Sequence, residues 1–131
     1  MTLISYLDLH VGLELPAQEF VFTRVDLIKY AGASGDFNVI HWNERVATEV
    51  GLPSVIAHGM LSAAYLAQML TNWVPQSALR SFNNRFTAMT QIGDIVSCSG
   101  KIVEKFEKDG EKFVRLELYT NTPEAQTIAA E

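Results

Sequence analysis

An α+β fold is predicted for this chain, and three features of the sequence predict it. The first half holds short helical patterns, residues 58–73 form one long and almost wholly apolar helical pattern, and the second half alternates apolar and polar residues. A helix that is apolar nearly all round has to be buried. We therefore expect one domain over residues 1–131, in which a curled antiparallel sheet wraps around the helix at about residues 58–73.

Composition limits the classes of function. Hydrophobic residues make up 48% of the 131 residues and charged residues 19%, which suits a folded globular chain. The net charge of −5 offers no basic surface for nucleic acid, and no stretch approaches the ~18 apolar residues of a membrane span. Residues 1–15 lack the basic start and continuous apolar run of a signal peptide, so a cytoplasmic protein is expected. The single cysteine, Cys98, excludes an intrachain disulfide.

The first half of the chain is expected to contain two short helices. A short strand is expected near residues 18–22, and Thr23 is suited to cap a helix over residues 24–31. Gly32 and Gly35 are expected to end this helix, whose apolar side would hold Val25, Ile28 and either Ala31 or Gly32. After a loop over residues 34–41, Asn43 is suited to cap a second helix over residues 44–50.

Strand patterns begin after Pro75, which ends the apolar helix. Alternation predicts strands over residues 82–89, 95–106 and 113–120, and a short last strand over 126–130. Asp109 and Gly110 form the turn signal between the second and third of these strands. The second half is therefore expected to be an antiparallel sheet.

The loop over residues 34–41 holds the first candidate site. Asp36 and His41 stand five positions apart, so they do not share a helical face, but a tight turn can aim both into one cleft. A carboxylate and an imidazole together can hold a water molecule and move protons at neutral pH, and Asn38 can orient them. The alternative is structural, because Asp and Asn side chains commonly stabilise loops by bonding the backbone.

The start of the apolar helix holds the second candidate. Free N–H groups at a helix N-terminus stabilise a developing oxyanion, and Gly59 would let a carbonyl oxygen approach closely. The alternative is that this glycine only permits tight packing. His58 is expected to be a buried hydrogen-bonding residue. Residues 58–74 contain no Asp or Glu, and the three histidines lack a recognised ligand spacing, so no metal site is predicted.

Taken together, three segments resemble MaoC-like (R)-specific enoyl hydratases and (3R)-hydroxyacyl-ACP dehydratases. Residues 30–41 with Ala47 resemble the family signature, residues 56–60 resemble the start of its central helix, and the likeness continues through residues 84–88. The chain looks most similar to the catalytic B subunits of mycobacterial-type dehydratases. Two positions depart from the signature, Val39 in place of a proline and Ala33 in place of a larger aliphatic residue or glycine, and Val39 loosens the loop.

The resemblance implies a hot-dog fold and a hydro-lyase of fatty acid metabolism that needs no cofactor and no metal. Water would add reversibly to a trans-2-enoyl thioester to give a (3R)-3-hydroxyacyl thioester. Asp36 and His41 would hold the water and move protons, Asn38 would orient them, and the backbone N–H of Gly59 would polarise the thioester carbonyl. The acyl-binding candidates are Tyr65, Met69 and Phe86.

The substrate would be carried by CoA or acyl carrier protein, and a dimer is expected, because a short sheet with an exposed edge favours pairing between subunits. A homodimer and a heterodimer with a related hot-dog subunit both remain open. Two other functions also remain open. One is a hot-dog acyl-thioesterase, although such enzymes commonly use a carboxylate on the central helix. The other is a non-catalytic acyl-binding subunit, in which loss of the Asp36 and His41 pair would be expected.

Overall fold

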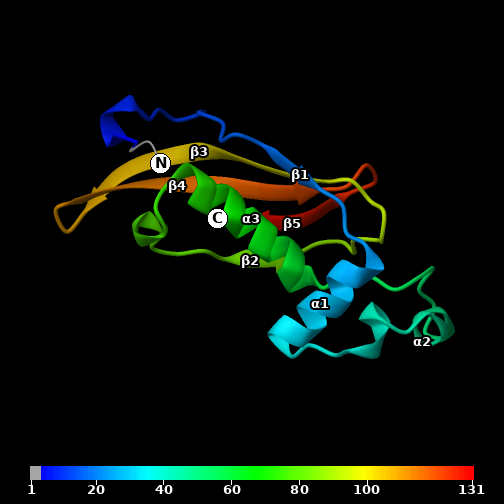
Figure 1. Cartoon of the computed structure of the whole chain (residues 1–131). Coiled ribbons are helices and arrows are strands. Elements are labelled where there is room, and N and C mark those ends of the chain that lie inside the picture. Colours follow the sequence, from blue (N-terminus) through cyan, green and yellow to red (C-terminus); the bar gives the residue numbers. More distant parts are fainter. Residues whose placement is uncertain (1–3) are drawn as a thin grey trace.

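The computed structural model describes residues 4–131, which form one antiparallel sheet, one long helix and several short helical segments (Figure 1). The α-helices and strands of the first half come before the strands that form most of the sheet. In chain order the elements are η1 (Tyr6–Asp8), β1 (Gln18–Phe20), α1 (Arg24–Ser34), η2 (Val39–His41), α2 (Glu44–Glu49), α3 (Gly59–Trp73), η3 (Gln76–Ala78), β2 (Asn84–Phe86), β3 (Val96–Lys108), β4 (Glu111–Asn121) and β5 (Gln126–Ala130).

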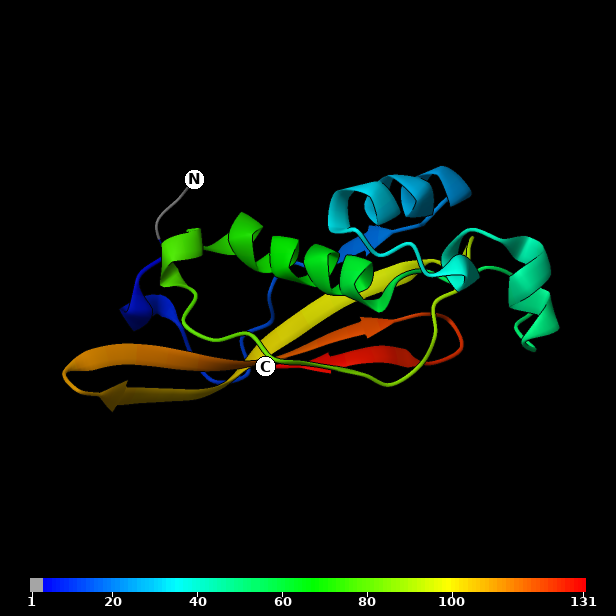
Figure 2. The same ribbon diagram turned by 90° about the horizontal axis from the view of Figure 1, so that it is seen from below.

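The sheet has five strands in the order β1-β3-β4-β5-β2, and every pairing is antiparallel. The long β3–β4 hairpin turns at Asp109 and Gly110, both at positive φ as the Asp-Gly signal predicts. Helix α3 lies over one face of the curved sheet, with α1 and α2 beyond its N-terminal end (Figure 2). The α+β class and the sheet around the central helix are therefore confirmed.

Helix α3 is the centre of the core. Leu66, Met69 and Leu70 on its sheet side are at most 2% exposed and pack with Leu118 and Ile128 from the central strands. Burying each of these side chains contributes about 1.5–3 kcal/mol, so a Leu66→Ala substitution should cost about 2–5 kcal/mol. A second cluster lies under α1 and α2 and contains Phe22, Leu27, Ala47, Val55 and Ala57. This second cluster fixes the short helices against the N-terminal end of α3.

For α1 the predicted end at Gly35 and the burial of Ala31 are confirmed, whereas the predicted roles of Gly32, Val25 and Ile28 were wrong. Gly32 lies inside the helix, which continues to Ser34 and ends where Gly35 takes the left-handed conformation at φ 77°. Leu27 and Ala31 are buried, whereas Val25 and Ile28 are 57% and 59% exposed. Helix α1 thus packs against the protein through Leu27 and Ala31, which lie one turn apart, and the predicted contacts of Val25 and Ile28 are not made. The predicted cap is confirmed, since Thr23 and Asp26 form a reciprocal capping box.

Strand β2 is shorter than the predicted strand over residues 82–89, because the chain leaves the sheet after Phe86. Beyond that point it runs to the segment before α3, where the N–H of Ala57 donates to the carbonyl of Thr90 over 2.9 Å. Strands β3 and β4 extend further into their hairpin than predicted. This detour of residues 87–91 brings the end of β2 beside the start of α3.

Cys98 lies in β3 with no exposed surface, as expected of a small strand residue. Burial raises the pKa of its thiol to about 11. Within residues 4–131, no helix has the length and apolar character needed to cross a bilayer.

Candidate active site

Asp36 and His41 come together at the loop between α1 and η2. Oδ2 of Asp36 lies 3.9 Å from Nε2 of His41, a separation longer than a direct hydrogen bond. The two side chains sit in different surroundings, because that of Asp36 is 50% exposed and that of His41 only 9%. The pair therefore has one partner open to incoming water and one held inside the protein.

The carboxylate of Asp36 uses its two oxygens for different purposes. Oδ1 accepts a hydrogen bond from the N–H of Asn38 over 3.2 Å, while Oδ2 faces His41. The side chain of Asn38 in turn accepts from the N–H of Ile40 over 3.3 Å and caps η2. The same carboxylate thus stabilises the turn, as the structural alternative predicts, and also faces the imidazole. In the described residues Asn38 bonds the backbone of η2, and so orients His41 only through the helix that carries it.

The ring of His41 has a defined tautomer. Its Nδ1 lies 2.7 Å from the carbonyl oxygen of Ile56, and a carbonyl can only accept, so Nδ1 carries the proton. In the neutral ring Nε2 is then the acceptor, and Nε2 is the atom that faces Asp36. The N–H of Ile56 donates to the carbonyl of Ile40 over 3.1 Å, which ties the two segments together. The arrangement leaves a basic nitrogen beside a carboxylate.

His58 lies directly behind this pair. Its ring stacks on that of His41 with centroids 3.8 Å apart, and its Nε2 donates to the main-chain carbonyl of Asp36 over 3.2 Å. The edge of Tyr30 meets the same ring at a centroid distance of 4.8 Å. Loss of solvation on burial is the main cause that lowers the pKa of His58. His58 is only 1% exposed, so the expectation of a buried hydrogen-bonding residue is confirmed.

Asp36, His41 and His58 also offer three possible ligand atoms within 4.8 Å of one another. Spacing along the sequence did not predict this cluster, which exists only because α3 begins beside the loop. An imidazole lone pair lies in the plane of its ring, and zinc would sit about 2.0–2.1 Å from each nitrogen. The rings of His41 and His58 stack with only 21° between their planes, so their lone pairs run side by side rather than converging. The cluster fits proton transfer better than metal binding.

Gly59 begins α3 at the floor of an apolar cavity of about 290 Å³. The helix has no side-chain cap, and its first-turn hydrogen bonds begin with the N–H of Leu61. Within residues 4–131 the N–H of Gly59 has no hydrogen-bond partner, as is usual for the first N–H groups of a helix. The cavity is lined by Asp36, Ile56, Ala57, Gly59, Met60, Ser62, Phe86, Ala88, Met89, Thr90, Thr127 and Ile128.

The three acyl-binding candidates lie in different places. Phe86 lines this cavity, and its ring covers Gly59 so closely that a Cβ on the glycine would lie 2.9 Å from Cε1 of the ring. Tyr65 stacks on Phe20 at 4.5 Å, and Met69 is 1% exposed in the core. Neither Tyr65 nor Met69 lines the cavity beside Asp36. Met89 and Met60 also line it, and closeness to Gly59 along the chain was the available signal for Met60.

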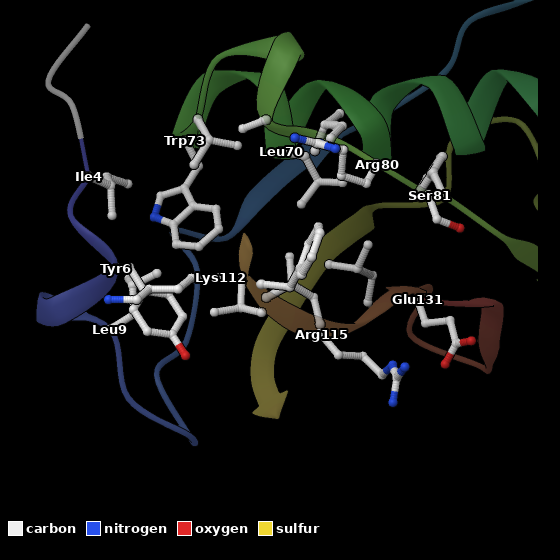
Figure 3. A pocket seen from close by; sticks show the side chains of 18 of the residues that line it. Ile4, Tyr6, Leu9, Leu70, Trp73, Arg80, Ser81, Lys112, Arg115 and Glu131 are labelled. Carbon is white, nitrogen blue, oxygen red and sulfur yellow. The ribbon is translucent and has the colours of Figure 1, made fainter. Parts of the chain in front are cut away.

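A second cavity of about 470 Å³ lies at the other end of α3 (Figure 3). Tyr6 and Trp73 line it on one side, with Arg80 and Lys112 among its charged groups. The guanidinium of Arg80 is already paired with Glu111 over 2.9 Å. Among the described residues that line this cavity there is no carboxylate–imidazole pair comparable to Asp36 and His41. The cavity at Gly59, which Asp36 also lines, is therefore the candidate active site.

A central helix covered by an antiparallel sheet, with a carboxylate and an imidazole facing each other beside the helix N-terminus, defines a hot-dog protein with a candidate site at that end of the helix. The chain belongs to the MaoC-like domain family, whose sequence pattern matches residues 11–122. Among solved structures, the R-hydratase PhaJ1 of Pseudomonas aeruginosa is 26% identical with a TM-score of 0.83, covering 95% of this chain and 80% of that one. The HadBC (3R)-hydroxyacyl-ACP dehydratase complex of Mycobacterium tuberculosis shares the fold at 16% identity, a TM-score of 0.70 and 92% coverage of both chains.

Curated relatives agree with this family. A 3-hydroxybutyryl-CoA dehydratase of Methylorubrum extorquens is 30% identical over 107 residues, which are 79% of this chain and 67% of that protein. The fatty acid synthase subunit beta of Saccharomyces cerevisiae is 31% identical over 121 residues, which cover 82% of this chain. The matched region is only 6% of the yeast subunit's length. Relatives named as hydratases and dehydratases are hydro-lyases, so the family is one of enzymes that add or remove water.

Proposed function

We propose that this chain hydrates trans-2-enoyl thioesters and, in reverse, dehydrates (3R)-3-hydroxyacyl thioesters in fatty acid metabolism. The observation that carries the proposal is the pairing of Asp36 with a His41 whose Nδ1 proton is held by Ile56. The family supports it, because relatives carry the names 3-hydroxybutyryl-CoA dehydratase and (R)-specific enoyl-CoA hydratase.

The gap between Asp36 and His41 suits one water molecule. With Oδ2 and Nε2 3.9 Å apart, a water can lie at about 2.8 Å from both atoms. Both atoms accept hydrogen bonds when His41 is neutral, so the two protons of the water are directed at them and an oxygen lone pair is left for the substrate. The water oxygen attacks C3 of the enoyl thioester while the carbon–carbon π bond opens, and the pair removes one proton from the water and delivers one to C2.

Negative charge builds up on the thioester oxygen as water adds to C3. The N–H of Gly59 at the start of α3 would donate a hydrogen bond to this oxygen, and the helix dipole would add to the stabilisation. Protonation at C2 then returns the charge to the pair, and the carbonyl is restored. The reverse sequence removes the C2 proton and expels water from C3, so one site serves both directions.

The cavity beside Gly59 is the proposed acyl site, with Phe86 as its main contact. Tyr65 and Met69 could meet an acyl chain only if it entered the core, because both side chains pack there. Phe86 is 48% exposed and Met60 and Met89 are 57% and 59% exposed around the cavity. A second hot-dog subunit over these side chains would exclude bulk water from the site.

We therefore propose a dimer, with a homodimer first and a heterodimer with a related hot-dog subunit as the alternative. The structural relatives include a heteromeric complex, HadBC. The acyl group would be carried by CoA or by acyl carrier protein, and the cytoplasmic location remains a prediction. Native mass spectrometry of the purified chain separates the two assemblies, because a homodimer forms without any added partner.

Hydration of crotonyl-CoA tests the function directly, through the loss of enoyl absorbance. Release of free CoA thiol without hydration would instead identify a thioesterase, and α3 offers no carboxylate for that chemistry. Tight acyl binding without turnover, alone or with a partner, would identify a non-catalytic subunit. Formation of 3-hydroxybutyryl-CoA with (3R) configuration is the expected result.

A further inference from the structure

We propose that His58 is a positioning residue, whose one buried side chain holds both members of the proton-transfer pair in place. It binds Asp36 through the main-chain carbonyl and supports His41 through the face of its ring. The proposal rests on the proposed function of the pair. It goes further by assigning a role to a residue that touches neither the water nor the acyl group in the mechanism above.

The first contact fixes the loop that carries the carboxylate. Nε2 of His58 donates to the carbonyl of Asp36 over 3.2 Å, across 22 positions of sequence. The side chain of Asp36 is half exposed, and the other described hydrogen bonds of this residue, from the N–H of Asn38 to Oδ1 and from its own N–H to Oγ of Ser34, stay within the loop. Position 39 of this loop is Val, which does not fix φ as a proline would. The bond from His58 therefore supplies a restraint from outside the loop.

The second contact fixes the imidazole. The rings of His58 and His41 stack at 3.8 Å with 21° between their planes, which restricts tilting of the His41 ring. Burial lowers the pKa of His58, and a neutral His58 adds no positive charge beside His41 when His41 takes up a proton. The charged and titratable groups that face His58 are Asp36, His41 and, from α1, Tyr30.

His58 can restrain its neighbours because its own segment is anchored. The N–H of Ile56 donates to Ile40 over 3.1 Å, and the N–H of Ala57 donates to Thr90 over 2.9 Å. The carbonyl of His58 accepts from the N–H of Leu61 over 3.1 Å and so joins the first turn of α3. With 1% of its surface exposed, the side chain has little freedom to move. His58 thus links the Asp36–His41 pair, the loop that carries Asp36 and the first turn of α3.

The two contacts can be separated by substitution. His58→Gln keeps a donor of similar reach and loses the stacked ring, whereas His58→Phe keeps a ring and loses the donor. Small displacements of reacting groups cost up to about a hundredfold in rate. Each variant should lower kcat on crotonyl-CoA by about tenfold to a hundredfold with little change in KM, and His58→Ala, which loses both contacts, should fall furthest. The matched control is His10→Gln at an exposed histidine, which should keep the wild-type kcat.

Thermal unfolding is recorded for every variant, and rates are compared at a temperature where all are folded. A purely stabilising role would lower the melting temperature and leave kcat unchanged. Wild-type kcat in both His58→Gln and His58→Phe would therefore overturn the proposal. If the wild type itself does not hydrate enoyl thioesters, the proposed function fails separately.

Nitrogen NMR of histidine-labelled wild type tests the positioning role without activity or substitution. The two contacts require the proton of neutral His58 on Nε2 and that of neutral His41 on Nδ1, each as a single state. Mixed tautomers at His58, or a proton on its Nδ1, would overturn the proposal. In the folded variants, loss of the single His41 tautomer in His58→Ala but not in His10→Gln is the expected result.

Discussion

Nε2 of His41 faces Oδ2 of Asp36 across 3.9 Å, while Nδ1 of the same ring is held by the carbonyl of Ile56 at 2.7 Å. The contact with Ile56 determines the tautomer of His41, because the carbonyl holds the imidazole proton on Nδ1, away from Asp36. Nε2 is then a bare, basic nitrogen beside a carboxylate whenever His41 is neutral. A base whose tautomer is set by the backbone needs no rearrangement before it takes a proton from water.

Removing either group of the pair should abolish most of the hydratase activity. Asp36→Asn keeps the size of the side chain but removes the charge, and His41→Ala removes the basic nitrogen. We expect kcat on crotonyl-CoA to fall by about 10²–10⁴-fold in each variant, which is the usual contribution of a general acid or base. The control is Asp109→Asn in the β3–β4 turn, where the residue is exposed and Asn tolerates the φ of 53°. Activity within threefold of wild type in both site variants would contradict the assignment.

Much of the fold and part of the site could be predicted from the sequence. Local rules place Thr23 as a cap, Gly35 as a helix end and α3 as the buried helix, because these depend on near neighbours. The pairing of Asp36 with His41 spans five residues and is local too. The contact between His58 and Asp36 spans 22 residues and exists only because α3 docks beside the loop, so no spacing rule finds it.

Apolar character alone could not separate cavity from core. Met69 and Phe86 both lie in apolar patterns, yet Met69 is 1% exposed in the core and Phe86 is 48% exposed beside Gly59. The difference arises where the chain leaves the sheet after Phe86 to reach Thr90 and the segment before α3. Helix α1 gives a second example in which apolar character does not predict burial, since Val25 fits an apolar helical pattern but faces solvent.

Chelation should leave the hydratase rate unchanged. The stacked rings of His41 and His58 direct their lone pairs in nearly parallel planes, which suits no common metal geometry. We expect the same kcat/KM before and after dialysis against EDTA, and no gain on adding zinc. Metal analysis of the dialysed protein provides the control. An activity that EDTA removes and zinc restores would show that Asp36, His41 and His58 bind a metal after all.

Gly59→Ala should impair catalysis with little loss of stability. A Cβ at this position would lie 2.9 Å from the ring of Phe86, which is half exposed and can turn away. The methyl group and the displaced ring would then narrow the space beside the N–H of Gly59, where the thioester oxygen is proposed to bind. We expect kcat/KM to fall about tenfold or more, while the free energy of unfolding changes by less than about 1 kcal/mol.

Gly32→Ala is the matched control for that substitution. Gly32 lies inside α1, and a Cβ there would meet nothing within 4 Å. Alanine is the better helix former by about 0.5–1 kcal/mol, so this variant should be slightly more stable and fully active. Equal activity of the Gly59→Ala and Gly32→Ala enzymes would exclude a role of Gly59 in binding the thioester oxygen.

The Cys98 thiol should be unreactive in the folded protein. It has no exposed surface in β3, and burial raises its pKa to about 11, so only about 0.1% would be thiolate at pH 8. We expect no reaction with Ellman's reagent over an hour in buffer and one thiol per chain in denaturant. Immediate labelling of the native protein would mean that β3 opens readily, and the core packing described here would be wrong.

Acid should destabilise the protein in part through His58. Its pKa in the folded state is lowered from the ordinary value of 6.5, mainly by loss of solvation, so the unfolded chain binds more protons as the pH falls below 6.5. The contribution of neutral His58 to the free energy of unfolding is therefore complete above pH 6.5. It is lost as the pH drops toward the folded-state pKa of His58. Urea unfolding of wild type and His58→Gln at several values between pH 8 and 5 measures the difference.

The difference between the two unfolding curves isolates His58 from the other titrating groups around it. We expect wild type to lose more stability than His58→Gln on acidification, because glutamine cannot take up the proton. His10→Gln should follow the wild-type curve, since His10 is exposed. Parallel curves for wild type and His58→Gln over this range would mean that His58 is protonated equally well in the folded and unfolded chains, and therefore is not held neutral behind His41.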